Sequence, residues 1–125
     1  MISPKGAELQ SLISLETGIE YMWSGDPAFW AKKSPVLFPI VGSLKNDTYY
    51  YNQQPYHLPR HGFARDKVFE AAKLNDSEAI FTLADSPETH SNYPFEFTLA
   101  LRYRLEGRSI SCTYEVFNPG DKALL

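Results

Sequence analysis

The residues best suited to chemistry in this chain gather at positions 58–66, where the sequence is LPRHGFARD. An imidazole can act as an acid, a base or a hydrogen-bond donor near neutral pH. His61 stands between an arginine and a glycine, where we expect the backbone to turn and the side chain to project into a cleft. The residue types alone leave a second interpretation open, a histidine on an ordinary surface loop.

Two arginines, Arg60 and Arg65, flank this histidine, and Asp66 follows directly. A planar guanidinium can bind adjacent sugar hydroxyls or a phosphate through two parallel contacts. For Asp66 we favour an ion pair with Arg65 that fixes the loop. Arg65 is able to serve both purposes.

A second unusual run, SPVLFPIVG, occupies positions 34–42. Its apolar residues 36–41 predict a buried extended segment, and Pro39 interrupts it. Because proline cannot donate to a sheet ladder, we expect an edge strand or a loop lining a cleft.

Several other kinds of site are disfavoured. His57 and His61 have the spacing of a helical metal site, but Pro59 lies between them and no third ligand is near, so no metal site is predicted. Cys112 alternates with apolar residues and is expected to be a small buried side chain. No carboxylate pair indicates glycoside hydrolysis, and no glycine-rich phosphate loop is present.

The composition narrows the class of protein further. The 125 residues suit one domain, and the net charge of −3 with a pI near 5.6 argues against nucleic acid as a partner. No apolar run suits a membrane helix, the start lacks a signal-peptide layout, and the single cysteine fits a reducing cytoplasm. Aromatic residues make up 14% of the chain, which favours a β-rich core over sugar-stacking platforms.

Alternating apolar and polar residues, separated by turn signals, predict an antiparallel β-sandwich. We expect strands near 8–15 and 19–23, hairpins at 49–58, 68–83 and 97–116, one helical turn at 28–33 and a polar loop at 85–94. Trp23, Phe29 and Trp30 bracket the short helix, and we expect them in the core, with a wall beside the cleft as the alternative.

With these residues in place, the chain resembles the aldose 1-epimerase (galactose mutarotase) family, and within it the LacX-like branch of bacteria. The matching segments are KGAELQSL (5–12), YMWSGDP (21–27) with Phe29-Trp30, PVLFPIVG (35–42), LPRHGFARD (58–66), YPFEF (93–97) and YEVFNP (114–119). They occur in order over nearly the whole chain.

The resemblance implies an all-β fold, the antiparallel galactose-mutarotase-like β-supersandwich, with residues 1–125 as the N-terminal portion of one domain. It implies interconversion of the α and β anomers of a free aldose, a hexose or a hexose phosphate, without a metal or organic cofactor. In the family, a glutamate removes the proton of the anomeric hydroxyl while a histidine donates to the ring oxygen.

The resemblance also assigns site residues. His61 matches the first of the family's two active-site histidines, and Arg65 belongs to the same run and is expected to contact the sugar. Ser43 stands where relatives often have a sugar-binding arginine, so we expect this contact either to be weaker or to be supplied by Arg60 or Lys45. The family's second histidine and its glutamate base are expected beyond residue 125, so we expect this chain alone to turn over poorly.

Two alternatives remain open. The chain can be a non-catalytic carbohydrate-binding module that keeps the sandwich and the His61 cleft, or a module that self-assembles through exposed sheet edges. Saturable sugar binding without anomer exchange would distinguish a binding module from an enzyme.

Overall fold

The two longest strands form the hairpin that residues 97–116 predict. In the computed structural model, which describes residues 1–125, β7 spans Thr98–Glu106 and β8 spans Ser109–Phe117. The chain turns between them at Gly107, whose φ of +58° is a left-handed conformation that glycine adopts readily. The prediction of this hairpin is confirmed.

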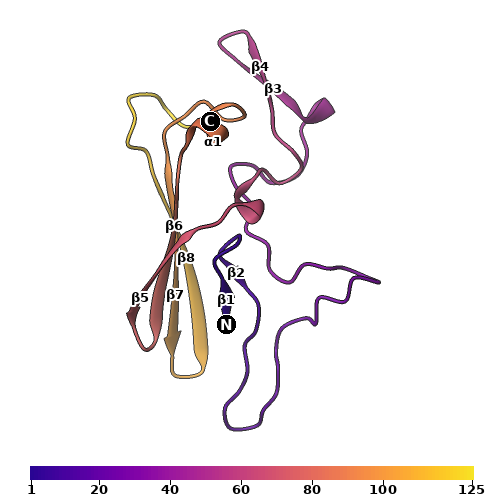
Figure 1. Ribbon diagram of the computed structural model, residues 1–125, viewed down its shortest axis with the longest axis vertical. Coiled ribbons are helices and arrows are strands. Elements are labelled where there is room, and N and C mark those ends of the chain that lie inside the picture. Colours follow the sequence, from indigo (N-terminus) through magenta and orange to yellow (C-terminus); the bar gives the residue numbers. More distant parts are fainter.

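A four-stranded antiparallel sheet, in the order β5-β6-β7-β8, carries most of the regular structure (Figure 1). β5 spans Glu70–Asn75 and β6 spans Glu78–Ala84, which confirms the second predicted hairpin. The register places Phe81, Leu101 and Tyr114 side by side across β6, β7 and β8. Because side chains alternate along a strand, the sheet has one predominantly apolar face.

The core of the molecule lies on that apolar face. Phe97, Leu99 and Leu101 are fully buried there. Two short strands, β1 (Ile2–Ser3) and β2 (Glu8–Leu9), pair with each other and pack against the same core (Figure 1).

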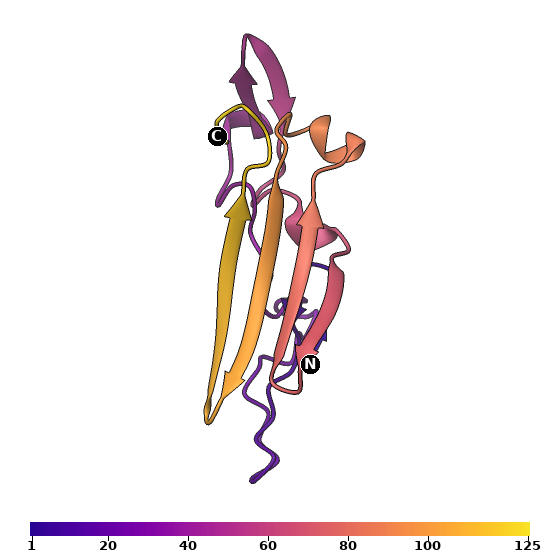
Figure 2. The same ribbon diagram turned by 90° about the vertical axis from the view of Figure 1, so that its left-hand side faces the viewer.

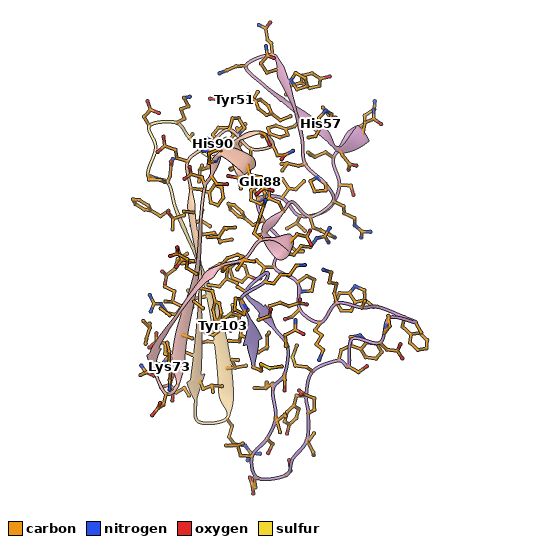
Figure 3. All side chains as sticks on the ribbon, in the orientation of Figure 1. Tyr51, His57, Lys73, Glu88, His90 and Tyr103 are labelled. Atoms are coloured by element: carbon orange, nitrogen blue, oxygen red, sulfur yellow. The ribbon has the colours of Figure 1, made fainter.

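Tyr103 links the sheet to this N-terminal pair. Its side chain is buried between β7 and the β1–β2 hairpin, and its hydroxyl donates to the Ala7 carbonyl oxygen at 2.8 Å (Figure 3). Burial raises the pKa of the Tyr103 hydroxyl, so the group remains a protonated donor.

We expect Tyr103→Phe to lower the free energy of unfolding by about 1–2 kcal/mol, because the buried Ala7 carbonyl loses this donor. Urea denaturation followed by circular dichroism measures the change. The matched control is Tyr50→Phe, since Tyr50 is 71% exposed, and it should stay within about 0.5 kcal/mol. Equal effects of the two substitutions would contradict the structural role of Tyr103.

A third hairpin stands at one end of the molecule (Figure 1). β3 (Thr48–Tyr51) and β4 (Gln54–His57) confirm the predicted strands around residues 52–55. The side chain of Asn92 donates to the His57 carbonyl oxygen at 2.8 Å and so ties this hairpin to the main body.

The polar segment 85–94 contains a helix that the sequence analysis did not predict. In α1 (Pro87–His90), the Ser86 hydroxyl accepts a hydrogen bond from the Thr89 N–H, and proline occupies the first turn. A serine followed by proline is a typical helix start, so the signal was present. No helix of the structure has the length and the apolar sequence that crossing a membrane would require.

Residues 11–34, here called the finger, extend away from the sheet (Figure 1). The strands predicted at 8–15 and 19–23 are reduced to β2 and a single bridge between Ile13 and Glu20. The helical turn predicted at 28–33 is limited to residues 26–30: the Asp26 carboxylate accepts the Ala28 N–H and its carbonyl oxygen accepts the Trp30 N–H, both at 2.8 Å, and no helix continues to residue 33.

The aromatic residues of the finger are not in the core, contrary to the prediction. Trp23, Phe29 and Trp30 are 43%, 81% and 50% exposed. Trp23 contacts Phe29 edge-on, and its indole N–H donates to the Trp30 carbonyl oxygen at 2.9 Å. These contacts hold the tip of the finger together, while its end is tied to β2 by the Glu8 carboxylate, which accepts the N–H groups of Lys33 and Ser34 at 2.8 Å.

Glu20 stabilises the start of the finger. Its carboxylate accepts the Ser11 hydroxyl at 2.5 Å and the N–H groups of Leu12 and Met22 at 2.8 and 2.9 Å. The bond from Ser11, followed by those from Met22 and Leu12, lowers the pKa of Glu20 from 4.5 to about 2.

The ionised Glu20 carboxylate stabilises the folded state through these hydrogen bonds. This stabilisation is fully present above the unfolded pKa of 4.5 and is lost as the pH falls toward 2. We therefore expect the amide signals of Leu12 and Met22 in NMR spectra to titrate with a midpoint near pH 2. The Glu20→Gln protein should lack this transition. A midpoint at pH 4.5 would show that the three hydrogen bonds do not form in solution.

Candidate active site

The two unusual sequence runs lie against each other. Phe38 and Gly62 form a parallel bridge, and the N–H groups of Phe63 and Ala64 donate to the Phe38 carbonyl oxygen at 2.9 and 3.2 Å. We call this unit, residues 35–42 together with residues 58–66, the loop junction. Its backbone bonds make one structure of two segments that are separate in sequence.

Gly62 allows this close approach. Its φ is +71°, and a Cβ added there would overlap the Phe38 carbonyl oxygen and lie 2.5 Å from the carbonyl carbon. Only a residue without a side chain fits between the two segments. The glycine beside the histidine is therefore a requirement of the junction.

His61 is held by Gly42 through two hydrogen bonds. The His61 N–H donates to the Gly42 carbonyl oxygen at 2.8 Å, and the Gly42 N–H donates to Nδ1 of the imidazole at 2.9 Å. Since a backbone amide can only donate, Nδ1 must be the acceptor, and the neutral ring carries its proton on Nε2.

The backbone of His61 is also unusual, with a φ of +70°. A side-chain-bearing residue in this region costs roughly 1 kcal/mol or more, and such residues are frequent at functional sites. The bonds to Gly42 hold the residue in this conformation. The side chain is partly exposed, with its Nε2 on the side away from Gly42.

Arg60 lies next to that nitrogen, with its Nε 3.1 Å from Nε2 of His61. A direct hydrogen bond between them would require an unprotonated Nε2, and Nδ1 could then not accept from Gly42. We assign the tautomer from Gly42, whose amide position is fixed by backbone pairing. The Arg60 Nε–H points at Nε2 in this structure, so with Nε2 protonated the Arg60 side chain must turn aside before the Nε2–H can donate to a ligand.

Arg65 binds the backbone of the same segment. Its Nη2 donates to the Arg60 carbonyl oxygen at 2.8 Å, and its Nε lies 3.6 Å from the Asp66 carboxylate. The ion pair expected between Arg65 and Asp66 is present. Arg65 thus positions Arg60 and His61, and its contact with a sugar stays a prediction.

Ser43 follows Gly42 directly and is exposed. Its position places it next in the chain to the residue that binds His61, but its role in sugar binding stays a prediction. The link between Gly42 and His61 has no local sequence signal, because 19 positions separate the two residues.

Neither of two cavities in the structure includes His61. One, of about 270 Å³, lies between the β1–β2 pair and the end of the sheet and is bordered by Ile2, Leu9 and Tyr103. The other, of about 180 Å³, is bordered by His90 and Glu96. The His61 side chain is partly exposed, and a cleft at the loop junction stays a prediction.

The remaining candidates lie outside the junction. His57 pairs with the Thr48 hydroxyl at 3.0 Å in the β3–β4 hairpin, and His90 of α1 lies 2.9 Å from the Asp85 carboxylate (Figure 3). Cys112 is exposed, which contradicts the prediction of a buried side chain. It faces the apolar side of the sheet, but nothing packs over β8 at this point.

Comparison with known proteins decides the family. The family model described as aldose 1-epimerase matches residues 1–125. The chain belongs to the aldose 1-epimerase family. Among curated proteins, the chain is 37% identical to the plasmid-encoded protein LacX of Lactococcus lactis subsp. lactis over 118 residues. The match covers 90% of this chain and 39% of LacX.

Solved structures show the same relationship for this aldose 1-epimerase family member. A galactose mutarotase related enzyme from Lactobacillus acidophilus is 42% identical with a TM-score of 0.96, over 98% of this chain and 41% of that one. A galactose mutarotase-like protein from Lactobacillus casei ATCC 334 is 40% identical with a TM-score of 0.94, over 98% and 42% of the two chains. The all-β, galactose-mutarotase-like fold is thereby confirmed, and the chain spans about two fifths of the length of these relatives.

Proposed function

We propose that residues 1–125 form the N-terminal portion of a single aldose-1-epimerase-like domain that acts in carbohydrate metabolism. The activity is the interconversion of the α and β anomers of a free aldose. The observation that carries this proposal is the Gly42 N–H bond to Nδ1 of His61, because it directs the Nε2 proton away from the junction.

In the proposed reaction, His61 donates this proton to the ring oxygen of the sugar. The base removes the proton of the anomeric hydroxyl, the bond between the anomeric carbon and the ring oxygen breaks, and an open-chain aldehyde forms. Rotation of the carbonyl group and ring closure then give the other anomer. The base is the family's glutamate, expected beyond residue 125. General acid–base assistance of this kind contributes about 10²- to 10⁴-fold per group.

The substrate is a hexose or a hexose phosphate, and the proposed location is the cytoplasm. The guanidinium of Arg60 lies next to Nε2 of His61, and its further N–H groups are donors that suit an oxygen of either substrate. Ser43 and Arg65 complete the proposed binding residues.

A chimera tests the activity. In it, this chain replaces the matching segment of the galactose mutarotase related enzyme of Lactobacillus acidophilus, whose fold it shares with a TM-score of 0.96. We expect exchange between anomers of glucose, galactose or their 6-phosphates, measured by NMR exchange spectroscopy, well above the rate in buffer. A folded chimera without exchange on any of these sugars would overturn the proposal.

A non-catalytic carbohydrate-binding module is the second candidate, and the donors gathered at His61 and Arg60 are compatible with sugar binding without catalysis. The discriminating result is saturable sugar binding by calorimetry without anomer exchange, in the chain and in the chimera alike.

A further inference from the structure

His61 occupies the third position of a tight turn. The Gly62 N–H donates to the Pro59 carbonyl oxygen at 2.8 Å, which closes the turn over the two residues between them. His61 has a φ of +70°, whereas Arg60 has a negative φ. This combination defines a type II turn, in which glycine or asparagine usually occupies the third position. The turn therefore holds His61 in a conformation that its side chain disfavours.

A type I turn is the alternative for this segment. It is closed by the same hydrogen bond, and a histidine adopts it without a positive φ. The two turn types differ mainly in the peptide between the second and third residues, which is rotated by roughly half a turn. In this chain that peptide joins Arg60 to His61. Contacts with other segments must therefore keep it in the type II orientation.

Both ends of this peptide are bound in the observed orientation. The His61 N–H donates to the Gly42 carbonyl oxygen at 2.8 Å. On the other side, Nη2 of Arg65 donates to the Arg60 carbonyl oxygen, also at 2.8 Å. Rotation of the peptide would turn its carbonyl oxygen toward that of Gly42 and its N–H toward a cationic donor, so both contacts would become repulsive. Since Gly42 also donates to Nδ1 of His61, the imidazole would lose its support.

The side chain of Arg65 extends from a fixed backbone. The residue lies in a single 3-10 turn, Ala64–Asp66, just before β5 (Figure 2). The N-terminal segment packs closely on this turn, because a Cβ added to Gly6 would lie 2.8 Å from the Arg65 carbonyl oxygen. The Asp66 carboxylate lies 3.6 Å from Nε of Arg65, whose side chain is 25% exposed. The guanidinium is thus directed at the turn that contains His61.

We propose that Arg65 is a positioning residue for His61. Its guanidinium holds the peptide before His61 in the type II orientation and so keeps the imidazole on the Gly42 N–H. This role is exerted before any sugar binds, and it is distinct from the sugar contact that the sequence predicts for Arg65. Its consequence for catalysis rests on the proposed function, whereas its effect on the turn does not.

Amide hydrogen exchange, followed by NMR in the chain without sugar, tests the effect on the turn. In Arg65→Met, the amides of His61 and Gly42 should exchange at least about tenfold faster, the low end for the loss of a hydrogen bond to a charged group. The amides of Phe63 and Ala64, which bind the other side of the junction, should stay within about twofold.

The matched control is Lys67→Met. Lys67 is also a cation of this segment, but it pairs with Glu88 at 2.6 Å. Its substitution should leave the exchange of the His61 amide within about twofold. Arg65→Gln, whose shorter side chain does not reach the Arg60 carbonyl oxygen, should reproduce the effect and gives the same readout if Arg65→Met does not fold. Unchanged exchange of the His61 amide in a folded Arg65 variant, or equal acceleration throughout the junction, would overturn the proposal.

Steady-state kinetics of the chimera test the consequence for catalysis. Arg65→Met should lower kcat for the conversion of anomers by about three- to tenfold, and by more than it raises KM, because the proton donor is misplaced in the transition state. A higher KM with unchanged kcat would assign Arg65 to sugar contact alone and overturn its positioning role. A chimera that converts no anomers would overturn the proposed function, while hydrogen exchange of the His61 amide still decides the role of Arg65 in the turn.

Discussion

Gly62→Ala is expected to destabilise the protein by about 2–4 kcal/mol, which is large for a change of one methyl group. The new Cβ would overlap the Phe38 carbonyl oxygen, at a backbone φ of +71° that side-chain-bearing residues rarely adopt. Because Phe38 also accepts the N–H groups of Phe63 and Ala64, the two segments of the junction must move apart. Urea denaturation measures the loss.

The matched control is Gly18→Ala in the finger. Gly18 has a φ of +70°, nearly that of Gly62, but nothing lies within 4 Å of the added Cβ. Its substitution should therefore cost only the conformational strain, about 1 kcal/mol. If the two substitutions cost the same, the contact between Gly62 and Phe38 is not a close one.

His61→Ala should lower kcat/KM for anomer exchange by at least about tenfold in the chimera, the low end for the loss of a positioned acid or donor. Sugar binding should weaken as well, because the Nε2 proton is one of the two donors at the junction. NMR exchange spectroscopy gives the rate, and circular dichroism shows whether the fold is kept.

His57→Ala is the control, since His57 lies four positions away in the β3–β4 hairpin and pairs with Thr48. It should leave kcat/KM within about twofold, as expected for a surface substitution away from the reacting groups. Unchanged turnover in a folded His61→Ala chimera would remove His61 from the proposed mechanism.

The sequence predicted the regular hairpins well, because alternation and turn residues are local signals. Strands β7 and β8 keep a period of two over nine residues each, and Gly107 marks their turn. The helix α1 was missed although Ser86-Pro87 is a helix start, since four residues give too little periodicity to detect.

The finger was predicted poorly for a different reason. The pattern of residues 8–15 is that of a strand, but a strand requires a partner, and only Ile13 and Glu20 pair there. The same holds for Cys112, whose apolar neighbours indicate a buried face that no other element covers. Periodicity predicts which side of an element is apolar, but it does not show what covers that side.

For the candidate site, the sequence singled out the runs 34–42 and 58–66 but did not predict that they lie against each other. The pair of Arg65 and Asp66 follows from adjacency, whereas the bond between Gly42 and His61 depends on how two distant loops meet. The tautomer of His61, and with it the direction of its proton, could only come from that contact.

The most direct test of the proposed role of His61 is an NMR titration of the imidazole nitrogens with glucose, galactose and their 6-phosphates. The chain has three histidines, and only His61 lies at the loop junction. We expect Nε2 of His61 to carry the proton in the unbound chain and its signal to shift saturably with at least one sugar, while His57 and His90 do not respond. A proton on Nδ1 of His61, or no saturable shift with any of these sugars, would contradict the assignment of the loop junction as the sugar site.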